Sequence, residues 1–159
     1  MSLADAKDLA TIIGVVIAVA ALAKGILEYT RNAVQARVER FAKLRQEFFD
    51  DPRIAKITEL LETDDPKLAD VSARDKWRFL GFFEQVALLL RAHLTTDQLA
   101  YYMFGYYATL CDRSRWFWGS AFPKDEAYWL LFLDFVRRMK VVEDSKRADP
   151  SKFVAKIRV

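Results

Sequence analysis

An uninterrupted apolar run at residues 9–23 limits the possible folds more than any other feature of the chain. It contains no charged side chain. Fifteen residues of helix rise about 22 Å, which is less than the roughly 30 Å hydrocarbon core of a membrane. Apolar residues resume after Lys24, and a span that continues to Tyr29 rises about 31 Å. Lys24 would then extend toward the headgroups, and Tyr29 would lie at the interface. We therefore predict a transmembrane anchor within residues 1–30.

Two other interpretations of this run remain open. A buried core helix is the first, because short apolar runs also occur in protein interiors. A cleaved signal peptide is the second, because Ala18-Val19-Ala20 and Ala21-Leu22-Ala23 resemble small-residue cleavage sites. A signal peptide begins with a positive region, however, and here Asp5 and Asp8 outweigh Lys7. The charge pattern therefore favours an anchor over a signal peptide.

Basic side chains follow the predicted span at Arg31, Arg37, Arg40, Lys43 and Arg45. The excess of positive charge on this side places the C-terminal part in the cytoplasm. More basic residues occur near the C-terminus, at Lys146, Arg147, Lys152, Lys156 and Arg158. Anionic lipid headgroups explain both sets better than nucleic acid does. The lipid bilayer is thus a predicted partner, and we do not expect nucleic acid binding.

The remaining sequence predicts helices throughout, because it has only 5 Gly and 4 Pro and long stretches of helical periodicity. We expect helices at about residues 4–50, 52–62, 73–93, 96–118 and 124–142. The fold class is all-α, with an N-terminal transmembrane helix that continues into a cytoplasmic bundle of about four helices. Residues 1–30 would be the anchor, residues 31–143 the helical domain, and residues 144–159 a basic tail.

Three local signals place the helix starts. Asp51 followed by Pro52 combines a capping carboxylate with proline in the first turn. Ser72 three residues before Asp75 is a variant of the capping box, and Thr95 three residues before Gln98 is a full one.

Glu84 is the most unusual polar residue, because its strip of the predicted helix is apolar. Trp77, Leu80 and Leu88 share that strip, and Arg91 is the nearest base on it. Glu84 and Arg91 could form a buried polar switch. The alternative is a carboxylate at the core boundary that pairs with a base of its own or a neighbouring helix.

Residues 113–118 mix bases with large aromatic side chains. Such a segment could stack on nucleic acid bases, lie at a membrane interface, or bind a protein partner. It could equally be the aromatic end of a helix that packs into the core. We take four residues as partner-binding candidates: Arg113, Arg115, Trp116 and Trp118.

Catalytic and metal-binding motifs are not evident. His93 is the only histidine and Cys111 the only cysteine, so an intramolecular disulfide and a zinc site of Cys and His ligands are both disfavoured. We predict no catalytic residue, no metal, no cofactor and no small-molecule substrate.

The element at residues 79–87, Phe-Leu-Gly-Phe-Phe-Glu-Gln-Val-Ala, is followed by a Tyr-rich helix and by Tyr128-Trp129. In these features the chain resembles a group of small bacterial proteins of unknown function, with one N-terminal membrane helix and a helical domain. Similar proteins occur as accessories of anti-phage systems, and some of them assemble into pores. The resemblance implies a location at the bacterial inner membrane, with one membrane pass and a cytoplasmic C-terminal domain.

Together these features predict a non-enzymatic, membrane-anchored interaction module that associates with itself or with a protein partner. The alternative is an oligomeric pore or channel-type effector, for example in anti-phage defence. For that alternative, small residues at spacings of four, three and four would let membrane helices approach closely. These residues are Gly14, Ala18, Ala21 and Gly25.

Overall fold

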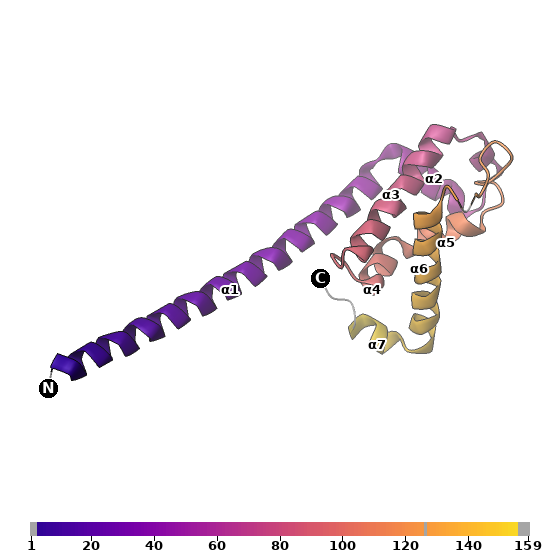
Figure 1. Cartoon of the computed structure of the whole chain (residues 1–159). Coiled ribbons are helices and arrows are strands. Elements are labelled where there is room, and N and C mark those ends of the chain that lie inside the picture. The colour runs from indigo at the N-terminus through magenta and orange to yellow at the C-terminus, as the bar shows by residue number, and fades with distance from the viewer. Residues whose placement is uncertain (1–2, 126, 156–159) are drawn as a thin grey trace. The chain divides into compact units, whose positions relative to one another are not determined.

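The computed structural model describes residues 3–125 and 127–155; within these, side chains are described at residues 18–29, 31–32, 35–125 and 127–155. Helices make up most of these residues, and no named strand occurs in the described ranges. The elements are α1 (Leu3–Asp50), α2 (Pro52–Glu62), the 3-10 helix η1 (Pro66–Asp70), α3 (Ala73–Arg91), α4 (Asp97–Ala100), the π-helix η2 (Tyr101–Gly105), α5 (Tyr106–Arg113), α6 (Leu130–Ala148) and α7 (Pro150–Ala155) (Figure 1). The predicted all-α class is confirmed.

The chain divides into two compact units, Met1–Glu39 and Arg40–Val159. Helix α1 begins in the first and ends in the second, so the predicted helix at residues 4–50 is confirmed. Among the described residues, no helical stretch is both long and apolar enough to cross a membrane. Of the predicted run at residues 9–23, the side chains of residues 9–17 lie outside the described part.

The predicted helix starts follow the local capping chemistry. Asp51 caps α2 and accepts a hydrogen bond from the backbone N–H of Arg53 at 2.9 Å. Ser72 caps α3 by accepting from the N–H of Asp75. The cap of α4 is Thr96, one residue later than predicted; Thr95 Oγ1 is buried and has no hydrogen-bond partner among the described residues.

Three predicted helix boundaries are wrong. The helix expected to reach residue 118 ends at Arg113, because the Ser114 backbone turns to an extended conformation. The helix expected from residue 124 begins at Leu130, after a turn in which the Asp125 carboxylate accepts from the N–H of Ala127. Helix α6 then continues to Ala148, past the helix end expected at residue 142 and into the predicted tail at residues 144–159, and Phe153 of α7 is buried.

Phenylalanine side chains form the core of the Arg40–Val159 unit. The ring of Phe48, near the end of α1, lies 4.7 Å from that of Phe82 and 5.8 Å from that of Phe83, measured between centroids. The ring of Phe83 is in turn 5.8 Å from those of Phe132 and Phe135 on α6. Helix α3 is therefore central, with the end of α1 on one side and α6 on another (Figure 1).

Gly105 permits close packing at the end of the π-helix. A Cβ atom there would lie 2.6 Å from Cδ2 of Tyr101 and 3.3 Å from Sδ of Met139 on α6. No larger residue fits without displacing one of these side chains.

Candidate functional site

The aromatic segment at residues 113–118 is held in place by Ser114. Its hydroxyl donates to the Asp64 carboxylate at 2.5 Å and accepts from the backbone N–H groups of Trp116 and Phe117. Asp64 has a positive φ of 47°. Its N–H bonds to the Leu61 carbonyl, in the pattern of a Schellman motif at the end of α2. The C-terminus of one helix therefore fixes the loop that follows another.

Lys76 anchors the same segment from within the core. The side chain is only 4% exposed, and its ammonium donates to the Phe117 carbonyl oxygen at 2.8 Å. The ammonium also lies 5.3 Å from the Phe117 ring centroid and 5.5 Å from that of Phe122. Burial lowers the pKa of Lys76, because it disfavours the charged form.

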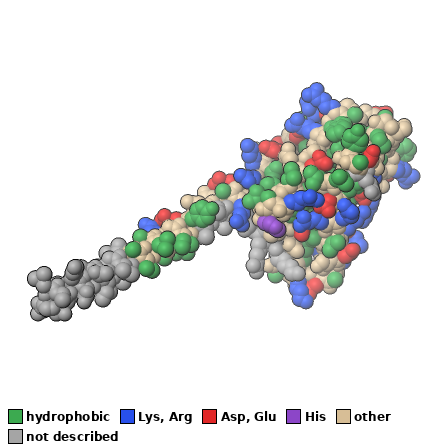
Figure 2. Space-filling view, in the orientation of Figure 1, with side chains coloured by type: hydrophobic (Ala, Val, Ile, Leu, Met, Phe, Trp, Pro, Cys, Tyr) green, Lys and Arg blue, Asp and Glu red, His purple; other side chains and the backbone are tan. Residues whose placement is uncertain are grey.

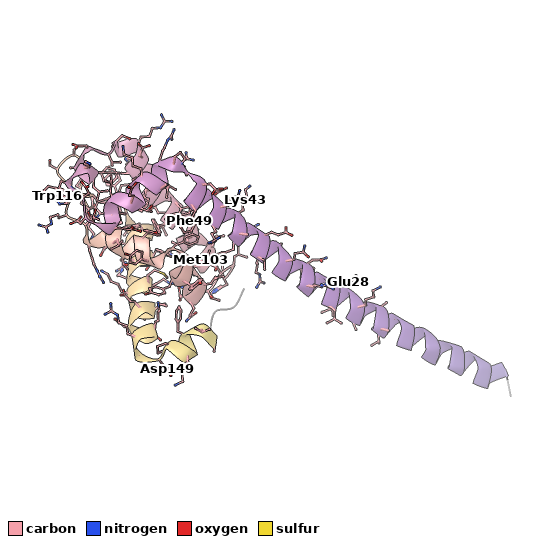
Figure 3. All side chains as sticks on the ribbon, turned by 180° about the vertical axis from the view of Figure 1, so that it is seen from behind. Glu28, Lys43, Phe49, Met103, Trp116 and Asp149 are labelled. Atoms are coloured by element: carbon pink, nitrogen blue, oxygen red, sulfur yellow. The ribbon has the colours of Figure 1, made fainter. Side chains whose placement is uncertain are left out.

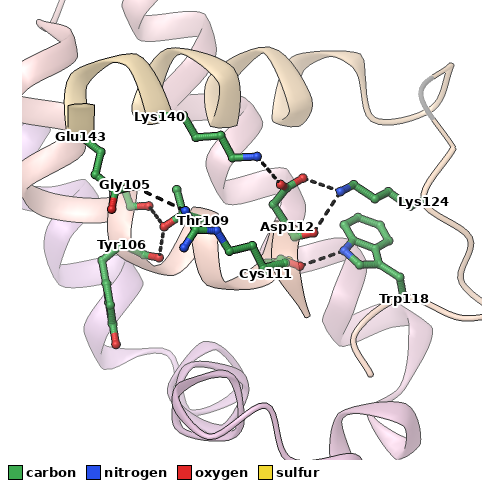
Figure 4. Close-up of polar contacts among 10 residues, drawn as sticks. Gly105, Tyr106, Thr109, Cys111, Asp112, Trp118, Lys124, Lys140 and Glu143 are labelled. Carbon is green, nitrogen blue, oxygen red and sulfur yellow. Dashed lines mark hydrogen bonds and ion pairs between the residues drawn. The ribbon is translucent and has the colours of Figure 1, made fainter. Parts of the chain in front are cut away.

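Asp112 binds two lysines beside this core (Figure 4). Its carboxylate accepts from Lys124 at 2.5 Å and from Lys140 of α6 at 2.7 Å. Burial raises the pKa of Asp112, but the hydrogen bonds from both lysines lower it by more. The pKa therefore lies below its ordinary value. This cluster attaches the segment after α5 to α6.

The four partner-binding candidates do not share one environment. Trp118 is partly buried, and its indole N–H donates to the Cys111 carbonyl oxygen at 2.8 Å. Arg113 is 3.8 Å from the Glu143 carboxylate, and Arg115 is 3.4 Å from that of Asp64. Trp116 is 38% exposed and lies at the edge of its unit (Figure 3). Arg113, Arg115 and Trp116 thus remain accessible, whereas Trp118 is partly buried and packs against the core.

Glu84 and Arg91 are not paired with each other. Arg91 forms an ion pair of 3.2 Å with Asp134 on α6. Glu84 is half-buried, and the described residues give it no hydrogen bond or ion pair. Burial raises its pKa. The sequence-based alternative of a paired boundary carboxylate is therefore not seen for Glu84.

The small residues predicted to mediate helix packing are described in part. Ala18, Ala21 and Gly25 are exposed, and a Cβ atom at Gly25 would meet nothing within 4 Å. Gly14 lies among the residues whose side chains are not described.

A groove of about 890 Å³ lies between the end of α1, the start of α2 and α3. Its floor includes Ile54 and Phe82, and its α3 wall includes Arg78, Gly81 and Gln85. The Arg78 side chain donates through Nε to Asp51 at 2.5 Å. This volume is within the range of small-molecule sites, but the lining is rich in both positive and negative charges.

Side chains that could carry chemistry are scattered. No group of three or more His, Cys, Asp or Glu residues in the described ranges is arranged to hold a metal ion. Cys111 is fully buried, and burial raises the pKa of its thiol well above the ordinary value. His93 is exposed at the end of α3, with a φ of 53°.

Lys76 and the lysine contacts of Asp112 are not among the site residues predicted from the sequence. Lys76 is three residues before Phe79 and seven before Phe83, so helical periodicity places it on the core face. That position could have revealed a buried base. The two lysines of Asp112 come from distant parts of the chain, and no local pattern predicts them.

Comparisons with protein-family models, with curated proteins and with solved structures gave no match.

Proposed function

We propose that the chain is a non-enzymatic, membrane-anchored interaction module at the inner face of a bacterial plasma membrane. Helix α1 would provide the anchor, and the unit that begins at Arg40 would associate with itself or bind a protein partner. The proposed location follows from the resemblance of residues 79–87 to small bacterial membrane-anchored helical proteins.

The observation that carries the proposal is the exposure of apolar side chains along α1. Every residue from 18 to 29 is exposed, and Figure 2 shows hydrophobic side chains along this segment. The large ones are Val19, Leu22, Ile26, Leu27 and Tyr29. These side chains lie on one broad side of the helix, and the exposed ion pair between Lys24 and Glu28 lies on the other. Large apolar side chains exposed along a helix are unfavourable in water and are suited to lipid. Basic residues follow at Arg31, Arg37 and Arg40, where anionic headgroups would attract them.

Membrane fractionation of the full chain tests the anchor. We expect the chain to sediment with membranes after an alkaline carbonate wash. Replacing Leu22 and Ile26 with Lys should release it, because two charges within the hydrocarbon region are costly. The matched control replaces two exposed valines of the other unit, Val141 and Val154, with Lys. This variant should stay in the membrane. Release of the unmodified chain by the wash would refute the anchor.

A pore or channel-type effector is the second candidate, and the exposed small residues of α1 favour it. Ala18, Ala21 and Gly25 would allow neighbouring copies of α1 to approach closely. The mass of the chain in nanodiscs separates the two functions. A ring-sized oligomer that conducts ions would support the pore, and a monomer or dimer without ion flux would support the interaction module.

A further inference from the structure

One face of α3 carries Trp77, Gly81, Glu84, Leu88 and Arg91, at alternating spacings of four and three residues. This spacing places all five on one strip of the helix surface. Trp77 and Leu88 are 52% and 53% exposed. The strip therefore presents a large apolar side chain toward each end and a carboxylate at its centre.

Trp77 is exposed but held in place. Its ring centroid lies 4.5 Å from that of Trp129 and 6.3 Å from that of Phe122. A tryptophan that is fixed on one side and open on the other loses little conformational entropy when another surface covers it. Such residues often provide much of the binding energy of an interface.

The centre of the strip has two features: the Glu84 carboxylate has no basic partner, and there is open space at Gly81, close to the base Arg78. Glu84 has no hydrogen-bond or ion-pair partner among the described residues. A Cβ atom at Gly81 would meet nothing within 4 Å, and Gly81 lines the groove together with Arg78 and Gln85. Among the described contacts, Arg78 donates a hydrogen bond only through Nε, to Asp51. A guanidinium has five N–H donors.

These features are complementary when the strip meets itself in the opposite direction. We propose that α3 pairs antiparallel with α3 of a second copy of this chain, about a twofold axis between Gly81 and Glu84. Trp77 packs on the partner's Leu88, and Glu84 enters the space beside the partner's Gly81, within reach of the partner's Arg78. Each contact occurs twice, as twofold symmetry requires. The pairing rests on the self-association included in the proposed function, and it identifies the surface responsible.

Charge and shape favour a second copy over an unrelated helix. An unrelated apolar helix would cover Trp77 and Leu88 but would leave the Glu84 carboxylate desolvated without a base, which is unfavourable. A second copy supplies the base and the space at the required positions. The strip is short, so we expect a weak interface that confinement to one membrane would reinforce.

Disulfide cross-linking of the full chain in nanodiscs tests this arrangement. Chains with Gly81→Cys and chains with Glu84→Cys, carrying tags of different size, should form a mixed disulfide, because the glycine allows the two backbones to approach closely. Cys111 is buried and should not react. Chains with Val141→Cys, exposed on α6, are the control and should cross-link much less. Equal cross-linking of all pairs, or none at all, would overturn the proposal.

Substitutions that block the contact provide a second test. Gly81→Leu fills the space at Gly81, where a Cβ atom meets nothing within 4 Å in the single copy, and Leu88→Lys places a charge against the partner's Trp77. Each should weaken self-association at least tenfold in energy-transfer measurements, whereas Val141→Lys should not. Circular dichroism should show that all three variants stay folded. Association as tight as that of the unmodified chain would exclude this surface.

The two proposals can fail separately. A chain that cross-links as expected but washes off membranes would refute the anchor and leave the pairing intact. A chain that stays in membranes but does not cross-link would refute the pairing alone.

Discussion

The ammonium of Lys76 donates a hydrogen bond to the Phe117 carbonyl oxygen at 2.8 Å and so joins α3 to a loop 41 residues further along the chain. The two aromatic rings beside it, of Phe117 and Phe122, provide further favourable electrostatic contact. No carboxylate among the described residues forms an ion pair with Lys76. The buried ammonium is thus held directly by a carbonyl oxygen and two aromatic rings, and Asp70 acts on it only at longer range.

Shortening Lys76 should destabilise the Arg40–Val159 unit mainly through lost packing. We expect Lys76→Ala to lower the free energy of unfolding by about 2–4 kcal/mol, because it leaves a cavity and an unsatisfied carbonyl group. Lys76→Met leaves the same carbonyl unsatisfied, but it keeps most of the volume and removes a buried charge, so its loss should be smaller, about 1 kcal/mol. Urea denaturation of both variants measures the difference. Equal losses would show that the charge, and not the packing, stabilises the loop.

The lowered pKa of Lys76 also predicts a dependence on pH. Between the folded-state pKa and the ordinary value of 10.5, the unfolded chain binds more protons at this site than the folded chain does. Stability from this residue therefore increases as the pH rises through that window. The unmodified chain should gain stability relative to Lys76→Met between pH 7 and 10.5, and other groups cancel in the difference. A constant difference would contradict the lowered pKa.

The sequence predicts the fold where local chemistry determines it. The start of α2 at Pro52 follows from the Asp51 cap, which acts within two residues. The C-terminal end of α5 and the start of α6 depend on distant contacts instead. Ser114 bonds to Asp64, 50 residues away, and Trp129 packs against Trp77. A rule based on neighbouring residues contains no information about such contacts.

The same distinction applies to the candidate site residues. Arg91 is on the strip of Glu84, as helical spacing requires, but Asp134 of another helix competes for it and forms the ion pair. Trp118 has the composition of an exposed binding residue, and only the position of the Cys111 carbonyl shows that its indole is used internally. Residue type predicted the chemistry available, and tertiary packing decided how it is used.

Adding one methyl group at Gly105 should be far more damaging than adding one at Gly81. A Cβ atom at Gly105 would lie 2.6 Å from the Tyr101 ring and 3.3 Å from Met139, so Gly105→Ala should cost about 1–3 kcal/mol. Gly81 lies in the middle of α3 with open space around it, so Gly81→Ala should stabilise by about 0.5–1 kcal/mol. Thermal denaturation of the two variants is the measurement. Similar effects of both would show that the π-helix adapts to a side chain.

His93 occupies the position after α3 at which glycine is favoured. Its φ is 53°, and the N–H of Leu94 bonds to the Leu89 carbonyl at 2.9 Å, as in a Schellman motif. His93→Gly should therefore stabilise by up to about 1 kcal/mol, because it removes the strain of the left-handed conformation.

Asp64 provides the contrast, because it has a similar φ of 47° but also accepts the Ser114 hydroxyl. Asp64→Gly relieves the same strain and loses this hydrogen bond, so it should destabilise the protein. Chemical denaturation of both variants tests the pair, and stabilisation by both would show that the Ser114 contact contributes little.

Asp112 should make stability depend on pH in the acidic range. Its pKa is lowered by the two lysines despite burial, so below the ordinary value of 3.8 the unfolded chain binds more protons at this site than the folded chain. The contribution of Asp112 is present above pH 3.8 and is lost as the pH falls through the lower folded-state pKa.

Asp112→Asn should therefore reduce the free energy of unfolding by about 1–2 kcal/mol at pH 7, because charge-assisted hydrogen bonds to two lysines are lost. The difference from the unmodified chain should shrink toward zero in strong acid. Asp134→Asn is the matched control, and because the partners of Asp134 are exposed arginines, we expect a smaller loss. The difference in the free energy of unfolding between Asp112→Asn and the unmodified chain could instead stay constant from pH 7 to pH 2. That result would mean that the substitution acts through packing only, and that the Lys124 and Lys140 contacts do not lower the carboxylate pKa.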